Sequence, residues 1–345
     1  MTGQFHHAVC DWSQTVSPDA TTVAFVSDRG GSPRVWLRPA PGGPATGLDT
    51  GAHPVVGLAW SPDGAWIAVT LAPGGAPRTE VWLVRPDGGD LHQVAGFGAT
   101  TAVVSRWLPA SGELALTEQD ATARAVLVTP GTGARRTLIE GELITLLDVS
   151  PDGGWLLLRR GPRGARHLLA VRPAGPADLV QLLPGTGSTD EGRFTADGSA
   201  VLARTDVGYE LAALVVVPLA APGRPAVLAR RLAAEVEHVE VSGDATVAAV
   251  LWNVHGGTSE VTLLDLRPDG RLDRSGPGPR VVSGFPGCVV DGCALSGDGT
   301  LLALTVQGPT QPRAVWCHRP AADDGAAPEA GAGTGTRVGV GVGSA

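Results

Sequence analysis

The chain has 345 residues, of which 43% are hydrophobic and 4% aromatic, and its formal net charge is −8. This length fits one large β domain or two ordinary domains, with enough apolar residues for a buried core. The negative charge argues against a nucleic-acid partner or an anionic membrane surface, because both would need a basic face.

Targeting signals and disulfides are not expected from the sequence. The first residues contain no basic segment followed by an apolar one, so we expect no signal peptide and a cytoplasmic protein without membrane contact. Four cysteines in a chain of this length make no disulfide framework, which is consistent with a reducing compartment.

A strand–turn–strand unit recurs along the chain. Its clearest copy has apolar residues up to Trp60, the turn Ser61-Pro62-Asp63-Gly64, and apolar residues again from Trp66. In such a turn Pro presets φ, Asp bonds to its own backbone, and Gly accepts a positive φ. The repeats are 41 to 54 residues apart, a spacing typical of β-propeller blades. In chain order the turns begin at Ser17, Ser61, Pro109 (a degenerate copy without Asp), Ser150, Thr195, Ser242 and Ser296.

Each repeat contains four strand-like runs, and no segment is a convincing amphipathic helix. Residues 229–241 have some helical character but are interpreted as running from a loop into the first strand of the sixth blade. We therefore predict an all-β fold, a seven-bladed β-propeller of four-stranded antiparallel blades, over residues 1–320. Residues 321–345 read as a Gly/Ala-rich linker or tail that could end in a closing strand. The runs of the second and fourth repeats are Val55–Trp60, Trp66–Leu71, Glu80–Arg85 and Leu91–Ala95, and Ile144–Val149, Trp155–Arg159, His167–Arg172 and Leu179–Leu183.

The seventh repeat shows three strands and no obvious fourth. They are Gly292–Leu295, Leu301–Val306 and Ala314–His318. Either Gln4–Cys10 or Arg337–Val342 could complete the blade. We favour the N-terminal segment, because glycine alternates through the C-terminal one and weakens it as a strand.

Known catalytic and cofactor motifs are missing from the sequence. It has no Gly-x-Ser-x-Gly, no His-Glu-x-x-His, no phosphate loop and no dinucleotide fingerprint, so we predict no catalytic residue, cofactor or metal ligand in this chain. Strand histidines, including His238, are interpreted as structural. The cysteines should meet where blades one and seven abut, as small buried apolar residues rather than as a zinc site or a disulfide. They are Cys10, Cys288, Cys293 and Cys317.

Two charge clusters are the candidates for a binding site. Arg159, Arg160 and Arg163 form a basic stretch in the fourth repeat, and Asp190 and Glu191 precede the first strand of the fifth. Either cluster could line the rim or the central channel and bind a charged ligand or a partner. Solvated loop charge is the simpler interpretation of both.

The repeats resemble those shared by TolB and the prolyl oligopeptidase (S9) serine peptidases. The segment Ser27-Asp28-Arg29-Gly30-Gly31-Ser32-Pro33-Arg34-Val35-Trp36 strengthens the likeness, which covers residues 11–320. Seven blades fit the prolyl oligopeptidase and acylaminoacyl-peptidase types better than the six-bladed TolB type or the eight-bladed dipeptidyl-peptidase IV type.

This resemblance implies a function without catalysis by this chain. In the S9 enzymes the Ser, Asp and His of the active site lie on an α/β-hydrolase domain that follows the propeller, and no position of that motif exists here. We therefore expect a substrate-gating propeller whose partner is a hydrolase domain, in cis or missing.

Two other functions remain open. One is a stand-alone TolB- or WD40-like scaffold for a protein or peptide partner. The other is a propeller enzyme, such as a lyase or glycosidase, with carboxylates in the channel. The second needs clustered acids at the first strands, where Asp190, Glu191 and Glu240 come nearest.

Overall fold

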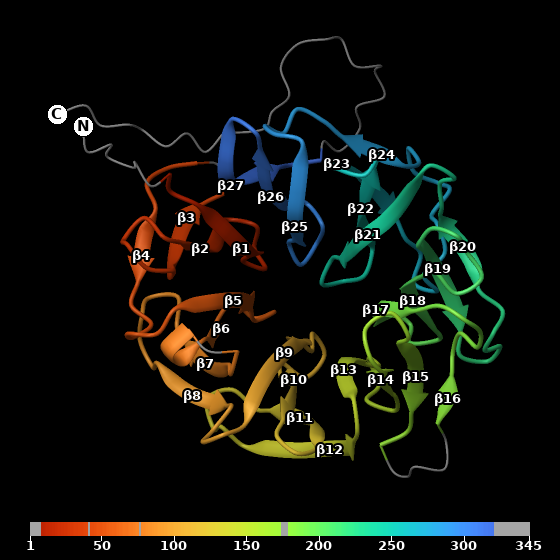
Figure 1. The fold of residues 1–345 in the computed structure, drawn as a ribbon, viewed down its shortest axis with the longest axis horizontal. Coiled ribbons are helices and arrows are strands. Elements are labelled where there is room, and N and C mark those ends of the chain that lie inside the picture. The colour runs from red at the N-terminus through yellow and green to blue at the C-terminus, as the bar shows by residue number, and fades with distance from the viewer. Residues whose placement is uncertain (1–7, 41, 76, 174–178, 321–345) are drawn as a thin grey trace, which may run out of the picture.

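Seven antiparallel sheets stand around one axis in the computed structural model, which describes residues 8–40, 42–75, 77–173 and 179–320 (Figure 1). The first strand of each sheet lies innermost and the last lies at the rim. The predicted seven-bladed β-propeller is therefore confirmed, with four strands in each of the first six blades.

The strand bounds agree with the expected runs to within one or two residues in the second and fourth blades. One short 3-10 helix, η1 (Pro73–Gly75), interrupts the second blade. Residues 230–233 connect two strands, as expected of the loop before the sixth blade. The strands are β1 (Asp11–Val16), β2 (Thr22–Ser27), β3 (Arg34–Pro39), β4 (Thr46–Leu48), β5 (Val55–Trp60), β6 (Ile67–Leu71), β7 (Glu80–Val84), β8 (His92–Ala95), β9 (Thr101–Trp107), β10 (Leu114–Gln119), β11 (Ala123–Val128), β12 (Arg135–Gly141), β13 (Ile144–Val149), β14 (Leu156–Arg160), β15 (His167–Val171), β16 (Val180–Gln181), β17 (Thr189–Phe194), β18 (Ala200–Thr205), β19 (Ala213–Pro218), β20 (Ala226–Ala229), β21 (Ala234–Val241), β22 (Val247–Val254), β23 (Thr258–Asp265), β24 (Arg280–Val282), β25 (Val289–Leu295), β26 (Leu302–Gly308) and β27 (Gln311–His318).

The seventh blade has three strands within the described residues, in the order β25-β26-β27. Of the two segments considered for a fourth strand, residues 4–7 and 337–342 lie outside the described residues, and residues 8–10 form no strand. The expected tail 321–345 also lies outside them.

Six of the seven turns are built by one pair of side chains. In the second blade the Ser61 hydroxyl donates to Asp63 Oδ1 over 2.5 Å and accepts from the Trp66 backbone N–H over 2.9 Å. The turn thereby closes the β5–β6 hairpin, and Gly64 takes the positive φ of 72° that the turn requires. The same side-chain bonds recur at Ser17 with Asp19, Ser150 with Asp152, Thr195 with Asp197, Ser242 with Asp244 and Ser296 with Asp298.

The third turn differs from the other six. It begins at Leu108, one residue before the expected Pro109, because the Leu108 N–H pairs with the Glu113 carbonyl as the Ser61 N–H pairs with that of Trp66. Gly112 then bonds back four residues to Leu108, where Gly64 bonds back three to Ser61. Leucine therefore stands where the other turns have a hydroxyl, and no side-chain pair braces this turn.

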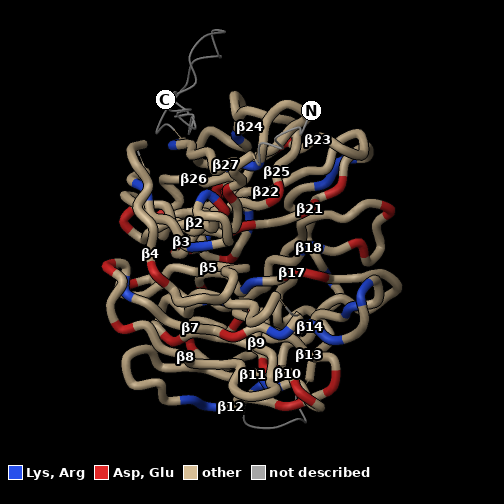
Figure 2. Tube along the Cα trace, turned by 60° about the vertical axis from the view of Figure 1, so that its left-hand side comes forward, with Lys and Arg blue, Asp and Glu red and all other residues tan. Residues whose placement is uncertain are grey.

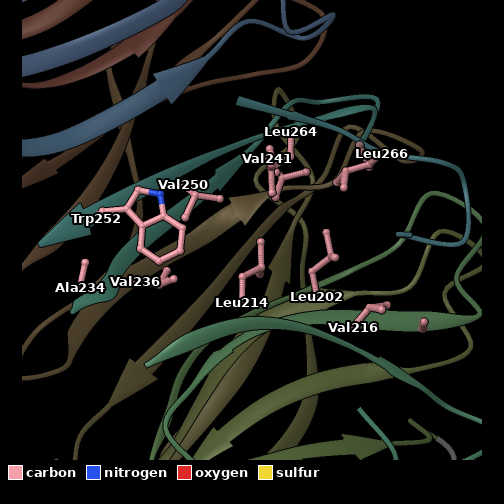
Figure 3. Close-up of a cluster of buried hydrophobic side chains, with 13 residues drawn as sticks. Leu202, Leu214, Val216, Ala234, Val236, Val241, Val250, Trp252, Leu264 and Leu266 are labelled. Carbon is pink, nitrogen blue, oxygen red and sulfur yellow. The ribbon is translucent and has the colours of Figure 1, made fainter. Parts of the chain in front are cut away.

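The hydrophobic core lies between neighbouring blades. Between blades five and six, Leu202 and Leu214 face Val236 and Trp252 (Figure 3), and Trp252 is 3% exposed. Burying a side chain of this size stabilises the fold by roughly 1.5–3 kcal/mol. Because each blade needs its neighbours to bury both faces, the ring of blades forms one unit.

Blades one and seven are joined by a buried side chain. Gln14 of β1 donates to the carbonyls of Gly292 and Ala303 over 2.9 and 3.1 Å, and its own carbonyl accepts from the Thr305 hydroxyl. All four cysteines belong to these two blades and are free thiols, but they do not meet at the seam as expected. Cys317 packs against blade one, whereas Cys293 packs against blade six. Only these two are buried, and Cys10 and Cys288 are half-buried.

Charge is spread over the described chain. Figure 2 shows Arg and acidic residues interspersed, without one large region of a single sign in that view. Among the described residues, no helix has the length and apolar character needed to cross a membrane.

Candidate functional site

A cavity of about 850 Å³ is lined by the first strands of all seven blades. These strands are β1, β5, β9, β13, β17, β21 and β25, the innermost in Figure 1. We call this cavity the channel.

Every first strand carries a register shift where it pairs with the second strand of its blade. In β17 the shift leaves Asp190 opposite no partner, between Thr189 and Glu191. A regular strand would send neighbouring residues to opposite faces, whereas a bulge re-aims them. This is why Asp190 and Glu191 can both line the channel.

Asp190 is held by arginines of blades four and five. Its Oδ1 lies 2.7 Å from Arg166 Nη1 and its Oδ2 lies 3.2 Å from Arg204 Nη1. Arg159 Nη1 donates to the Asp190 backbone carbonyl over 3.2 Å. Burial and the nearby Arg166 charge lower the pKa of Arg159. The arginines thus largely compensate the charge of Asp190, and Asp190, held by them, forms a fixed part of the channel wall.

The predicted basic cluster is only partly a channel feature. Arg159 lines the channel together with Asp190 and Glu191, so these three candidates come together. Arg160 and Arg163 are exposed and line neither of the two cavities described for this chain. For these two, solvated charge is the better description, because Arg160 ends β14, Arg163 lies in the loop that follows, and both side chains are exposed.

A second cluster centres on His238 of β21. His238 Nδ1 lies 2.7 Å from Glu191 Oε1, and its Nε2 lies 3.9 Å from Glu240 Oε2. The Val239 N–H donates to the other Glu191 oxygen over 3.0 Å and fixes that carboxylate. The imidazole also meets the thiol of Cys293 within hydrogen-bonding reach. All four side chains line the channel.

The electrostatics of this cluster favour a protonated imidazole. Burial alone would lower the pKa of His238, but the Cys293 and Glu191 side chains outweigh it and raise that pKa well above its ordinary value. Burial raises the pKa of Glu240, and His238 offsets part of this effect. Burial also raises the pKa of the Cys293 thiol. An imidazole between two carboxylates can hold a proton and move it to a bound molecule.

The sequence of β21 contains a signal for this cluster. The strand Ala234–Val241 reads AEVEHVEV, with three glutamates and one histidine in eight residues. Two of these four charged or titratable residues, His238 and Glu240, line the channel, whereas Glu235 and Glu237 do not. His238 and Cys293, interpreted from the sequence as structural residues, both line the channel. Among the described residues, no group of three or more His, Cys, Asp or Glu side chains is arranged to hold a metal ion.

Comparison with known proteins supports the fold. No protein-family model and no curated protein matches the sequence. Among solved structures, a prolyl endopeptidase is 19% identical with a TM-score of 0.66, and prolyl oligopeptidase B from Galerina marginata is 13% identical with a TM-score of 0.64. In each case the match covers 90% of this chain and 48% of the other, and it falls on the β-propeller domain.

Two further neighbours consist largely of propeller. TolB from Acinetobacter baumannii is 13% identical with a TM-score of 0.55, over 90% of this chain and 76% of the other. Oligogalacturonate lyase from Vibrio parahaemolyticus is 11% identical with a TM-score of 0.64, over 89% and 88%. The chain is thus a β-propeller similar to that of prolyl oligopeptidase and also to TolB, and it spans about half the length of the peptidase chains it matches.

Proposed function

We propose that this chain is a non-catalytic propeller that admits short peptides to the active site of an α/β-hydrolase domain. The observation that carries the proposal is the channel, whose volume of about 850 Å³ is within the range of binding cavities. Its wall is polar on the side of blades five and six and offers fixed carboxylates and guanidinium groups. Such a wall can bind the amides and charged ends of an extended peptide, whereas a folded protein is too large to enter.

The likeness to prolyl oligopeptidase propellers supports the same function. The structural match falls on half of each peptidase chain, the half without the hydrolase domain. A gating propeller needs no nucleophile of its own, which fits the missing Gly-x-Ser-x-Gly motif.

The test is binding and hydrolysis by this chain alone. A fluorescent peptide of a few residues should bind saturably and be recovered intact. The double variant Asp190→Asn/Glu191→Gln should weaken binding, while Arg160→Gln, at the exposed end of β14, should not. Cleavage of the peptide by the purified chain would overturn the proposal.

A second candidate is acid–base catalysis inside the channel. The observation that favours it is the His238 imidazole between Glu191 and Glu240. The similarity to an oligogalacturonate lyase over nearly the whole of that chain adds support. Turnover of an acidic oligosaccharide that His238→Gln abolishes would favour this candidate.

A third candidate, a stand-alone scaffold, rests on the TolB-like fold alone. It predicts that a pull-down with this chain recovers a protein partner.

A further inference from the structure

A second cavity opens on the side of the propeller where the turns lie. Its volume is about 450 Å³, and blades three to six contribute to it. It includes the irregular third turn, from Leu108 to Ser111, and the regular turn that begins at Ser150. We call this cavity the turn pocket.

Apolar side chains make most of the wall of the turn pocket. At the third turn, Leu108 stands where six other blades have a hydroxyl, and Ala110 follows where they have the turn aspartate. At this turn, apolar side chains thus replace the hydroxyl and carboxylate that hydrogen-bond to each other in the other six turns. Further apolar lining comes from Leu127, Leu138, Val149, Leu156 and Phe194.

Two arginines stand where the turn pocket meets the channel. Arg106 of β9 and Arg193 of β17 line both cavities. Arg193 donates to the backbone carbonyls of Val241 and Gly243. No carboxylate of the described residues forms an ion pair with it. Its hydrogen bonds therefore go to backbone carbonyls, and the carboxylates of Asp148, Glu240 and Asp244 act on its charge without a direct ion pair.

Arg106 has one carboxylate partner, and that partner is shared. Asp148 Oδ2 lies 3.1 Å from Arg106 Nη1 and also accepts the Phe194 N–H over 2.9 Å. The other oxygen of Asp148 accepts the Val149 N–H over 2.9 Å. One carboxylate thus serves one guanidinium and two backbone donors.

This arrangement affects the pKa of Arg193. Burial, and next the positive charge of Arg106, lower the pKa of Arg193 to about 9. An anion bound beside the two guanidinium groups would remove the repulsion between them. Arginine suits a carboxylate well, because its planar fork donates two parallel hydrogen bonds.

We propose that the turn pocket binds a carboxylate that carries an apolar body, with the carboxylate at Arg106 and Arg193 and the apolar body against Leu108, Leu138 and Phe194. The free C-terminus of a peptide that ends in leucine and a medium-chain fatty acid share this chemistry. This site is independent of the gating role, because it lies beside the channel and needs no hydrolase domain.

The test uses three probes on the whole chain, measured by isothermal titration calorimetry. They are N-acetyl-Leu-Leu with a free carboxylate, the same compound as its C-terminal amide, and octanoate. The acid should bind about tenfold or more tightly than the amide, because the amide leaves the guanidinium groups without an anion. A higher affinity for the dipeptide than for octanoate identifies a peptide C-terminus as the ligand. A higher affinity for octanoate identifies a fatty acid. Either result supports the carboxylate site.

Variants separate the charge from the pocket. Arg193→Met should abolish the preference for acid over amide, and Ala110→Phe should weaken both by filling the apolar part. Arg163→Met is the matched control, since Arg163 is exposed and outside both cavities. If Arg193→Met fails to fold, as thermal unfolding will show, Arg106→Met tests the same charge. Equal affinity for acid and amide, an unchanged preference in a folded arginine variant, or no binding of any probe would overturn the proposal.

Discussion

His238 Nδ1 and Glu191 Oε1 lie 2.7 Å apart and join the innermost strands of blades five and six inside the channel. The contact exists because the bulges in β17 and β21 bring both side chains to the axis. Together with the Cys293 side chain it raises the pKa of the His238 imidazole, and so affects the charge that a molecule in the channel meets.

Removing the Glu191 charge should lower the pKa of His238. In Glu191→Gln the imidazolium loses its closest carboxylate. Burial, which lowers the pKa of His238, is then opposed less strongly. The measurement is the pH titration of the His238 ring signal by NMR, assigned with a His238→Gln variant. Asp190→Asn is the control, because its carboxylate contacts Arg166 and Arg204. An unchanged titration in Glu191→Gln would contradict the prediction.

The same pair predicts a dependence of stability on alkaline pH. Because the pKa of His238 is higher in the folded chain than its ordinary value, the proton stabilises the fold below that ordinary value, and this contribution is lost as pH rises through the folded pKa. The free energy of unfolding from urea titrations should fall over this range. His238→Gln should flatten the fall, and an equally steep fall in this variant would rule His238 out as its source.

Gln14 should be important for closing the ring. Gln14→Ala removes the bonds to Gly292 and Ala303 and leaves the buried Thr305 hydroxyl without its acceptor. The expected loss is about 1–3 kcal/mol in the free energy of unfolding, measured in urea. Gln119→Ala, at an exposed strand end, is the matched control and should change little. A loss no larger than that of the control would show that the seam depends on apolar packing alone.

The turn aspartates predict a loss of stability in acid. Burial alone would raise the pKa of Asp63, but bonds from the Ser61 hydroxyl and the Ala65 N–H outweigh it and lower that pKa below 3.8. A carboxyl with a depressed folded pKa stabilises the fold above its unfolded pKa, and the contribution is lost as pH falls through the folded value.

Two variants check this prediction in urea titrations from pH 6 downward. Asp63→Asn should be less stable than the unmodified chain near neutral pH and should lose less on acidification. Ser61→Ala keeps the carboxylate but removes a donor, so it should show a smaller acid loss than the unmodified chain. Parallel pH curves for all three proteins would argue against the turn carboxylates as the cause.

The repeated turns make the fold predictable from the sequence. The site is less predictable, because it depends on places where the chain departs from the repeat. Ser61 with Asp63 and their equivalents give a local signal that depends on three or four residues, so seven blades could be counted. The inward aim of Glu191 and His238 depends on bulges that no short motif marks. The turn pocket depends on Leu108, whose role emerges only when its backbone pairing is compared with that of Ser61.

The charge clusters show the same limit. Asp190 and Glu191 were found as candidates because two adjacent acids stand out, whereas Arg106 and Arg193 stand alone in their strands and were missed. Arg160 and Arg163 were selected by adjacency, yet the chain leaves the channel wall after Arg159 and exposes them.

The most direct test of the gating function is to isolate the protein from its own cells with an antibody against the propeller and to treat the material with a fluorophosphonate, which labels active serine hydrolases. The account predicts a labelled α/β-hydrolase, either in the same polypeptide, well above the 35.0 kDa of this chain, or bound to it. A 35.0 kDa chain recovered without any labelled hydrolase would contradict the account.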